Sequence, residues 1–439
     1  MHKEQRESFV KRIVNIAENA RDPRVHGEKR SRFISREGIA FRLTDGCLDL
    51  WDDILEDLLI KNDWNKKFSE EHVDAKLQEI ISKIIKDGNS QKAFEYFDQL
   101  TNEYEQFSKE HILHIPLFGI ELNEGSIKIG NLNLKKMDDK NTDELISRLE
   151  HAISKTSNTD DEKQMYFEQE KEDVNKFLRN KVCAVVTVTA EPERALEIAE
   201  AEAQRTIDLL RYAIPAIYSG DKRVIIGLQG EYSWQTRYVP IIAVDGSGFN
   251  IINRVVGPLY PLELSTENLE YMRKIGVFSL GSLLEEGHLN DFEETLFRGI
   301  EWFSRSQTQT ELKNKLLNLI TVLETFLTPG NNDPIQKSIQ EGTAILLEND
   351  ALPRKKLMKK IKIFYGLRSK LSHGHNKEVL DADVRELSNI SRLLIMALIE
   401  LKDQFETREE LINWVEYRKL GGIPEKWSEY KDSLKSLAT

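Results

Sequence analysis

An arginine and a histidine five positions apart, Arg368 and His373, are the residues of this chain whose types and spacing best suit chemistry. They lie in the segment YGLRSKLSHGHN, and the chain contains nine histidines in all. An imidazole titrates near neutral pH and transfers protons, whereas a guanidinium stays charged and binds two phosphate oxygens at once. The pair has two interpretations: a catalytic pair, or the ordinary end of a helix.

The spacing alone is weak evidence, because the segment ENARDPRVHGEK repeats it near the start of the chain. There Arg21 stands five positions before His26, but Pro23 lies between them and disfavours a continuous helix. In the second copy, Gly374 suits the left-handed residue that ends a helix, so the sequence places His373 at a helix terminus. We therefore favour the second copy as the functional one.

A basic stretch accompanies this second copy. Between Ala351 and Lys377 there is no acidic residue, although the chain as a whole has 74 acidic and 62 basic residues and a net charge of -12. A solvated helix face is the usual explanation of such a run. With Arg368 and His373 at its end, a phosphate-bearing ligand is the better interpretation. The candidate ligand-binding residues are Arg354, Lys355, Lys356, Lys359, Lys360, Lys362 and Lys370.

The elements that must position the pair are helices. From about Phe292 onward apolar residues recur at helical spacing, and four segments with short connections predict a helical bundle. These segments are 310–330, 333–349, 352–374 and 381–405. Arg368 lies on the third. Five residues of regular helix turn two side chains about 140° apart, so Arg368 and His373 converge only if the helix ends there or a second copy faces the first.

The rest of the chain predicts a multidomain α+β fold. Residues 1–110 form a mainly helical N-terminal region, residues 111–290 a central α+β or α/β block, and residues 291–439 an all-α bundle with a C-terminal extension. In the central block, β-prone runs separated at 123–125 predict a hairpin with its turn there. No internal repeat is visible.

Composition excludes several classes of protein. No apolar run approaches the roughly 18 residues that a membrane span requires, and the first thirty residues lack the features of a signal peptide, so we expect a cytoplasmic protein without a membrane partner. The two cysteines, Cys47 and Cys183, predict neither a disulfide framework nor a zinc site, and we expect no metal ion and no cofactor. The net negative charge argues against uniform coating of nucleic acid, so any contact with RNA must be local.

Two stretches resemble a known family: RGIEWFSRSQ leading into LITVLETFL, and KIKIFYGLRSKLSHGHN. Both resemble the HEPN domain family, and within it the ApeA-like HEPN proteins of prokaryotic anti-phage defence. The resemblance covers roughly residues 292–405 and implies a HEPN-like bundle. In that family two bundles form a homodimer, and two Arg-x-x-x-x-His motifs make one composite site for metal-independent RNA cleavage.

The resemblance assigns a role to each residue of the motif. It makes His373 the general acid/base and Arg368 the cation that binds phosphate. Family members often carry Asn or Asp after the arginine, where this chain has Ser369, which can still hydrogen-bond. RNA supplies its own nucleophile, the 2'-hydroxyl, so such an endoribonuclease leaves 2',3'-cyclic phosphate and 5'-hydroxyl ends. The resemblance further implies the toxic effector of an antiviral or abortive-infection response, released by a phage-derived trigger or regulatory partner acting on the sensor and regulatory region 111–290.

Three nearby residues keep two interpretations each. Tyr365 stacks on a base or orients Arg368, or else packs in the core or an interface. Glu324 pairs with Arg368 inside the bundle, or else lies at a polar edge. His375 is an auxiliary group, or else an exposed residue after the helix.

Two other functions compete with a ribonuclease. One is a non-catalytic HEPN module that dimerises and binds RNA or a nucleotide through the same cationic helix. The other is an independent enzyme in the first 290 residues. Against it, the sequence has no phosphate-binding Walker loop, dinucleotide glycine fingerprint, nucleophile elbow or His-Glu-x-x-His motif.

Overall fold

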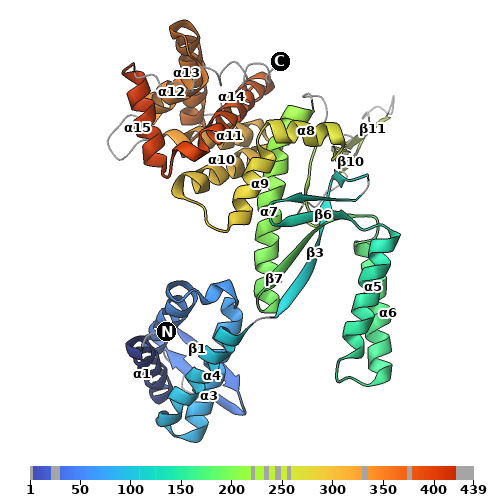
Figure 1. Ribbon diagram of the computed structural model, residues 1–439, viewed down its shortest axis with the longest axis vertical. Coiled ribbons are helices and arrows are strands. Elements are labelled where there is room, and N and C mark those ends of the chain that lie inside the picture. Colours follow the sequence, from blue (N-terminus) through green and yellow to red (C-terminus); the bar gives the residue numbers. More distant parts are fainter. Residues whose placement is uncertain are drawn as a thin grey trace. The chain divides into compact units, whose positions relative to one another are not determined.

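The computed structural model describes residues 3–20, 30–107, 109–123, 125–218, 223–231, 237–242, 249–254, 259–328, 335–372 and 378–421 (Figure 1). It is mostly helical, with a small antiparallel sheet and a C-terminal helical region. The chain divides into two compact units, one made of Met1–Leu113 with Val186–Ala201 and the other of His114–Val185 with Glu202–Thr439. The fold is therefore multidomain and α+β, as the sequence predicts.

The first unit packs helices around a β-hairpin. Its helices are α1 (Lys3–Asn19), α2 (Asp45–Glu56), α3 (Glu70–Asp87) and α4 (Ala93–Gln106), with short helical turns η1 (Asp57–Lys61), η2 (Trp64–Lys66) and η3 (Ser90–Lys92). The hairpin pairs β1 (Ser31–Arg36) with β2 (Ile39–Thr44). Large apolar side chains, among them Trp51, Phe68 and Phe97, are fully buried between these elements and form one core.

A five-stranded sheet has the order β5-β6-β7-β3-β9, and most of its residues belong to the second unit. Its strands are β3 (Glu110–Phe118), β5 (Ser126–Ile129), β6 (Leu132–Lys136), β7 (Val182–Thr189) and β9 (Gly227–Leu228). The pairs β5–β6, β6–β7 and β3–β9 are antiparallel. Of the two interpretations of the central block, these antiparallel pairs favour α+β.

The hairpin of this sheet lies later in the chain than the sequence predicts. Its turn is at Gly130 and Asn131, because Ile129 pairs with Leu132. Gly130 has a φ of +60°, and a Cβ there would lie 3.3 Å from the carbonyl oxygen of Gly281. Among the described strands, no hairpin has its turn at 123–125, because the strand before it, Ile120–Glu121, pairs with Leu262–Glu263 and not with β5.

Shorter strands and three helices complete this part of the chain. The helices are α5 (Asp139–Ser154) and α6 (Asp160–Phe177), which lie side by side, and the long α7 (Pro192–Ile217) (Figure 1). Two-residue pairs form between β4 (Ile120–Glu121) and β13 (Leu262–Glu263) and between β8 (Arg223–Val224) and β12 (Leu259–Tyr260). A separate antiparallel pair joins β10 (Arg237–Ile242) and β11 (Phe249–Arg254).

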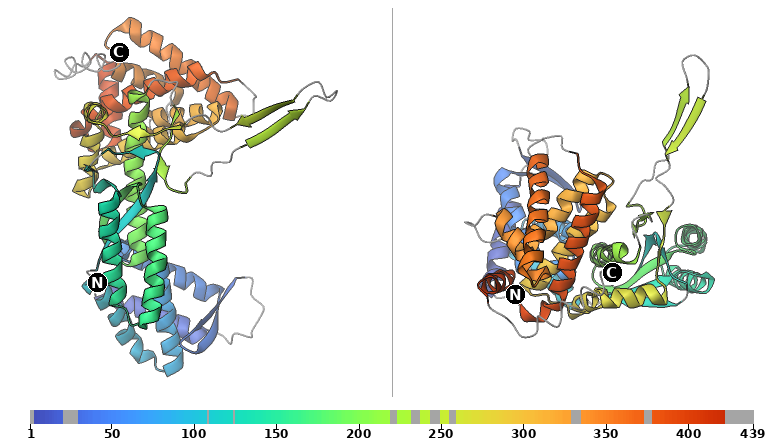
Figure 2. Two further views of the ribbon diagram at one scale, coloured as in Figure 1. Left: turned by 90° about the vertical axis from the view of Figure 1, so that its right-hand side faces the viewer. Right: turned by 90° about the horizontal axis from the view of Figure 1, so that it is seen from above.

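The regular elements of the described C-terminal region are all helices. It contains α8 (Thr266–Lys274), α9 (Val277–Glu286), α10 (Asp291–Thr308), α11 (Leu312–Leu327), α12 (Ile335–Leu347), α13 (Ala351–Ser372), α14 (Asp381–Glu400), η4 (Lys402–Gln404) and α15 (Arg408–Lys419). The four helices that the sequence predicts are α11 to α14, and α10 and α15 pack with them. Figure 2 shows these helices gathered in one group, coloured from orange to red.

Helix α11 is the centre of this group, since it contacts α10, α12, α13 and α14. Its apolar stripe, which includes Leu316, Leu323 and Phe326, is fully buried. On α10, Gly299 faces this stripe, and a Cβ at that position would lie 2.1 Å from Cζ of Phe326. The missing side chain lets α10 approach α11 closely enough for the Phe326 ring to fill the contact.

Candidate functional site

Arg368 lies near the C-terminal end of the described part of α13. This helix packs against α11 and α12 through Ile361 and Phe364, both of which are buried. Arg368 is four residues after Phe364 and therefore follows it on the same side of the helix. The packing of α13 thus holds Arg368 next to α11 rather than on the solvent face.

Three of the residues singled out in the sequence meet at this contact, and we call them the Arg368 cluster: Glu324 of α11 with Tyr365 and Arg368 of α13. Nη2 of Arg368 lies 3.3 Å from Oε1 of Glu324. The guanidinium carbon lies 5.6 Å from the centre of the Tyr365 ring. Of the two interpretations of Glu324, the structure shows the ion pair with Arg368, and it places the Tyr365 ring beside the guanidinium.

The ion pair between Arg368 and Glu324 is partly exposed to solvent. The side chain of Arg368 is 37% exposed and that of Glu324 18%. Burial and the neighbouring Glu324 carboxylate raise the pKa of Tyr365, while Arg368 lowers it. A partly exposed ion pair of this kind is worth only about 0–1 kcal/mol. The guanidinium has five N–H donors, so the donors beyond this one described ion pair remain available to phosphate oxygens.

The basic residues of α13 do not join Arg368 in one surface. The side chains of Lys359 and Arg368 are nine residues apart and point about 180° away from each other on a regular helix. Most of the exposed lysines lie about 120° or more around the helix from Arg368: Lys355, Lys356, Lys359, Lys362 and Lys370. Lys360 is nearer, at about 80°. Lys360 forms an ion pair with Glu386. Helical phase therefore separates most of these lysines from Arg368, and their role in RNA binding stays a prediction.

Arg354 and Ser369 lie on α13 but outside the Arg368 cluster. Arg354 is on the same side of α13 as Arg368, but fourteen residues of helix separate them by about 21 Å. Its Nε donates to the carbonyl oxygen of Glu348 at 2.8 Å. Ser369 is half-buried beside Arg368. Neither adds a described contact to the Arg368 cluster.

The histidines of the predicted site lie outside the described residues. This holds for His373 and His375, and also for Arg21 and His26 of the first copy of the motif. Their roles stay predictions. Within the described part of the chain, no group of three or more His, Cys, Asp or Glu side chains is arranged to hold a metal ion.

A buried polar network on α7, which the sequence prediction missed, connects that helix with α10. Oδ1 of Asp208 accepts hydrogen bonds from Oγ of Ser304 at 2.5 Å and from Nε2 of Gln204 at 2.9 Å. Arg211 donates to the carbonyl oxygen of Ile226 and binds the Glu231 carboxylate at 3.0 Å. Burial raises the pKa of Asp208 to about 6. The available signal was a pair of opposite charges, Asp208 and Arg211, inside the apolar stretch TIDLLRYAI.

Arg392 of α14 is a second residue that sequence reasoning missed. It is the only charged residue within the apolar stretch ISRLLIMALI, and its side chain is buried. A lone arginine in such a stretch is the signal that points to a buried polar site.

The comparisons with known proteins assign no function to this chain. No family model, no curated protein and no solved structure matches this chain. Among the described helices, none has the length and apolar character needed to cross a membrane.

Proposed function

We propose that this chain is a HEPN-type endoribonuclease in which Arg368 binds the scissile phosphate and His373 transfers protons. The observation that supports the proposal is the Arg368 cluster. Glu324 and Tyr365 hold the guanidinium in one orientation, half open to solvent, five residues before His373. A cation so oriented near a histidine is what phosphate-ester cleavage without a metal ion requires.

The proposed reaction uses the 2'-hydroxyl of the RNA as the nucleophile. An imidazole removes its proton, the oxygen attacks the adjacent phosphorus, and the bond to the 5'-oxygen breaks as that oxygen gains a proton. Arg368 stabilises the negative charge that develops on the phosphate oxygens. The products are a 2',3'-cyclic phosphate and a 5'-hydroxyl. Displacement of Glu324 by phosphate on Arg368 costs little, because the ion pair is partly exposed.

A second copy of the chain belongs to the proposal. Two residues five positions apart on a regular helix point about 140° away from each other. A homodimer through the C-terminal bundle brings the His373 of one copy to the Arg368 of the other. In this proposal the dimer is the cytoplasmic effector of an antiviral response, and a phage-derived trigger acts through the remainder of the chain.

The test is cleavage of labelled RNA by the purified full-length chain and by Arg368→Ala and His373→Ala. We expect each variant to lose about 100-fold or more of the cleavage rate, and the wild-type products to carry cyclic phosphate ends. The matched controls are Arg305→Ala, which removes an exposed arginine of α10 paired with Glu301, and His288→Ala in an exposed loop. Cleavage that persists in both site variants would refute the proposal.

The composite site has a test of its own. If both copies contribute to one site, the specific activity falls when the enzyme is diluted below the dissociation constant of the dimer. Sedimentation at the same concentrations gives the fraction of dimer. A specific activity that stays constant as the chain becomes monomeric rules out the shared site, although it leaves RNA cleavage itself intact.

One observation favours a second candidate, a non-catalytic module that binds RNA or a nucleotide. Lys355, Lys356, Lys359 and Lys362 are exposed on the side of α13 opposite Arg368, and none forms a described ion pair. Such a surface binds phosphates without chemistry, with an affinity that falls steeply with salt. The two functions separate if the wild type binds RNA but leaves it uncleaved, and if Lys356→Gln with Lys359→Gln lowers the salt dependence of that binding.

A further inference from the structure

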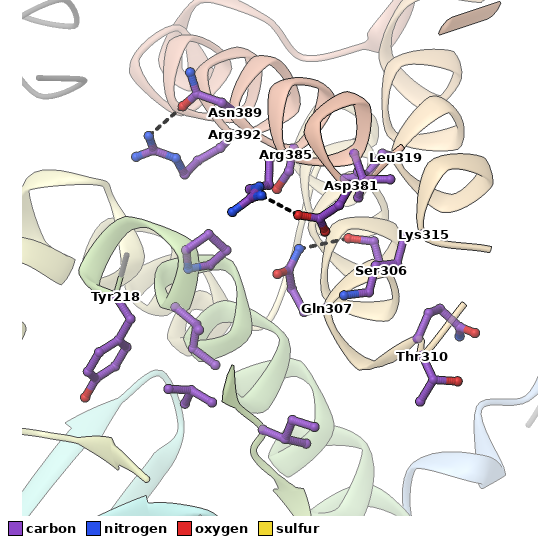
Figure 3. Close-up of a pocket in the computed structure, with 17 residues that line it drawn as sticks. Tyr218, Ser306, Gln307, Thr310, Lys315, Leu319, Asp381, Arg385, Asn389 and Arg392 are labelled. Carbon is purple, nitrogen blue, oxygen red and sulfur yellow. Dashed lines mark hydrogen bonds and ion pairs between the residues drawn. The ribbon is translucent and has the colours of Figure 1, made fainter. Parts of the chain in front are cut away.

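A half-open cavity of about 700 Å3 lies beside the C-terminal end of α7, where residues of α10, α11 and α14 line it (Figure 3). It shares no residue with the Arg368 cluster. Its size is within the range of sites that bind small organic molecules. Its apolar part comes from Ile214, Pro215, Val224, Leu319 and Val384, and its polar part from α14 and the end of α10.

The residue that gives the cavity its character is Arg392. Figure 3 shows it extending from α14 with Asn389 beside it. It is only 7% exposed. Its contacts are the side-chain oxygen of Asn389 at 2.8 Å and the sulfur of Met396 at 4.0 Å, and no carboxylate of the described residues pairs with it. A buried charge without a counterion is strongly unfavourable, so an anionic ligand that binds this guanidinium would stabilise the folded chain.

The charged residues that line the cavity also favour an anionic ligand. Three cationic residues line it, Lys315, Arg385 and Arg392, against one carboxylate, Asp381. Asp381 is already engaged by Arg385 at 2.6 Å. Arg392 is therefore the lining charge without a carboxylate partner among the described residues, and a guanidinium binds phosphate through two parallel hydrogen bonds.

We propose that this cavity binds a small organic phosphate, with the phosphate on Arg392 and the rest of the molecule against the apolar wall. The side-chain amides of Gln307 and Asn389, both of which line the cavity, are hydrogen-bonding groups for the polar edge of such a ligand. Because Arg392 is almost completely buried, it reaches a small molecule that enters the cavity rather than the backbone of a long RNA. The site is independent of the ribonuclease proposal.

Thermal unfolding of the full-length chain tests the proposal with three probes at constant ionic strength: adenosine 5'-monophosphate, inorganic phosphate and adenosine. We expect the melting temperature to rise by about 3 °C with adenosine 5'-monophosphate at one hundred times its dissociation constant, to rise less with phosphate and to stay unchanged with adenosine. In Arg392→Met the rise disappears, and the melting temperature without ligand equals or exceeds that of the wild type, because an uncompensated buried charge is removed. Arg305→Met, on the exposed face of α10, serves as the control that keeps the wild-type response.

Three results overturn the proposal. The first is the absence of any rise with millimolar phosphate or adenosine 5'-monophosphate. The second is an equal rise in the wild type and in Arg392→Met. The third is a lower melting temperature of Arg392→Met without ligand, which makes Arg392 a purely structural residue. If Arg392→Met does not fold, Arg392→Lys decides: a rise weaker than in the wild type supports the two-point contact with phosphate, and an unchanged rise contradicts it.

Discussion

The buried carboxyl of Asp208 makes the stability of this protein depend on pH between about 4 and 6. Burial raises the pKa of Asp208 to about 6, from the value of 3.8 that applies in the unfolded chain. Between these values the folded chain holds a proton that the unfolded chain has released. The contribution of Asp208 to stability is therefore fully present below pH 3.8 and is lost as the pH rises through 6.

The size of the effect follows from the shift. A difference of about two pH units corresponds to about 3 kcal/mol of the free energy of unfolding, since one unit is 1.36 kcal/mol. Asp208→Asn replaces the carboxyl by a neutral group of the same shape, whose oxygen still accepts from Ser304 and Gln204. We expect the variant to lose this part of the pH dependence and to be more stable than the wild type above pH 6. The variant removes the ion pair between Nη1 of Arg211 and Oδ1 of Asp208, which lie 3.5 Å apart, but Arg211 keeps the Glu231 carboxylate as a partner.

The assay is urea unfolding followed by circular dichroism at several pH values from 4 to 7. The quantity of interest is the free energy of unfolding of the wild type minus that of Asp208→Asn at each pH. The matched control is Asp161→Asn, which removes an exposed carboxylate from α6. Parallel pH curves for the wild type and Asp208→Asn would refute the assignment of a raised pKa to Asp208.

Two further predictions concern packing and the buried thiol. Gly299→Ala places a Cβ 2.1 Å from Cζ of Phe326, so we expect the free energy of unfolding, measured with urea, to fall by about 1–3 kcal/mol. In the control, Gly366→Ala on α13, the new Cβ meets nothing within 4 Å, so we expect an equal or higher stability than that of the wild type. Equal stabilities of the two variants would contradict the close α10–α11 contact. Burial raises the pKa of Cys183 to about 12, so we expect it to react with a thiol reagent at pH 8 only when urea opens the fold. Rapid labelling of Cys183 in the native chain would contradict this.

Helices were the most predictable part of the fold. Their apolar residues recur at a spacing set by the helix itself, so the segments that became α11 to α14 were visible without tertiary information. The hairpin turn was misplaced because the residues at 123–125 mark a turn by composition, while the strands on either side of them, β4 and β5, pair with β13 and β6 and not with each other. Sequence patterns do not show which neighbour a strand selects.

The candidate site was predictable only in part, for a similar reason. The pairing of Glu324 with Arg368 depends on the contact between α11 and α13, and was one of two interpretations. The run of lysines near Arg368 suggested one surface because a linear sequence does not display helical phase, whereas α13 turns Lys359 and Arg368 to opposite sides. Arg392 and Asp208 acquire their chemistry from burial by helices distant in the sequence.

Helix α11 is shared by the two sites. Lys315 faces the cavity and Glu324 holds Arg368, and nine residues of helix place these side chains about 180° apart on one rod. A rotation of α11 about its own axis therefore alters both sites together. Coupling through such a helix is reciprocal. If a ligand in the cavity changes the affinity of Arg368 for phosphate by some factor, then phosphate on Arg368 changes the affinity of the cavity for its ligand by the same factor.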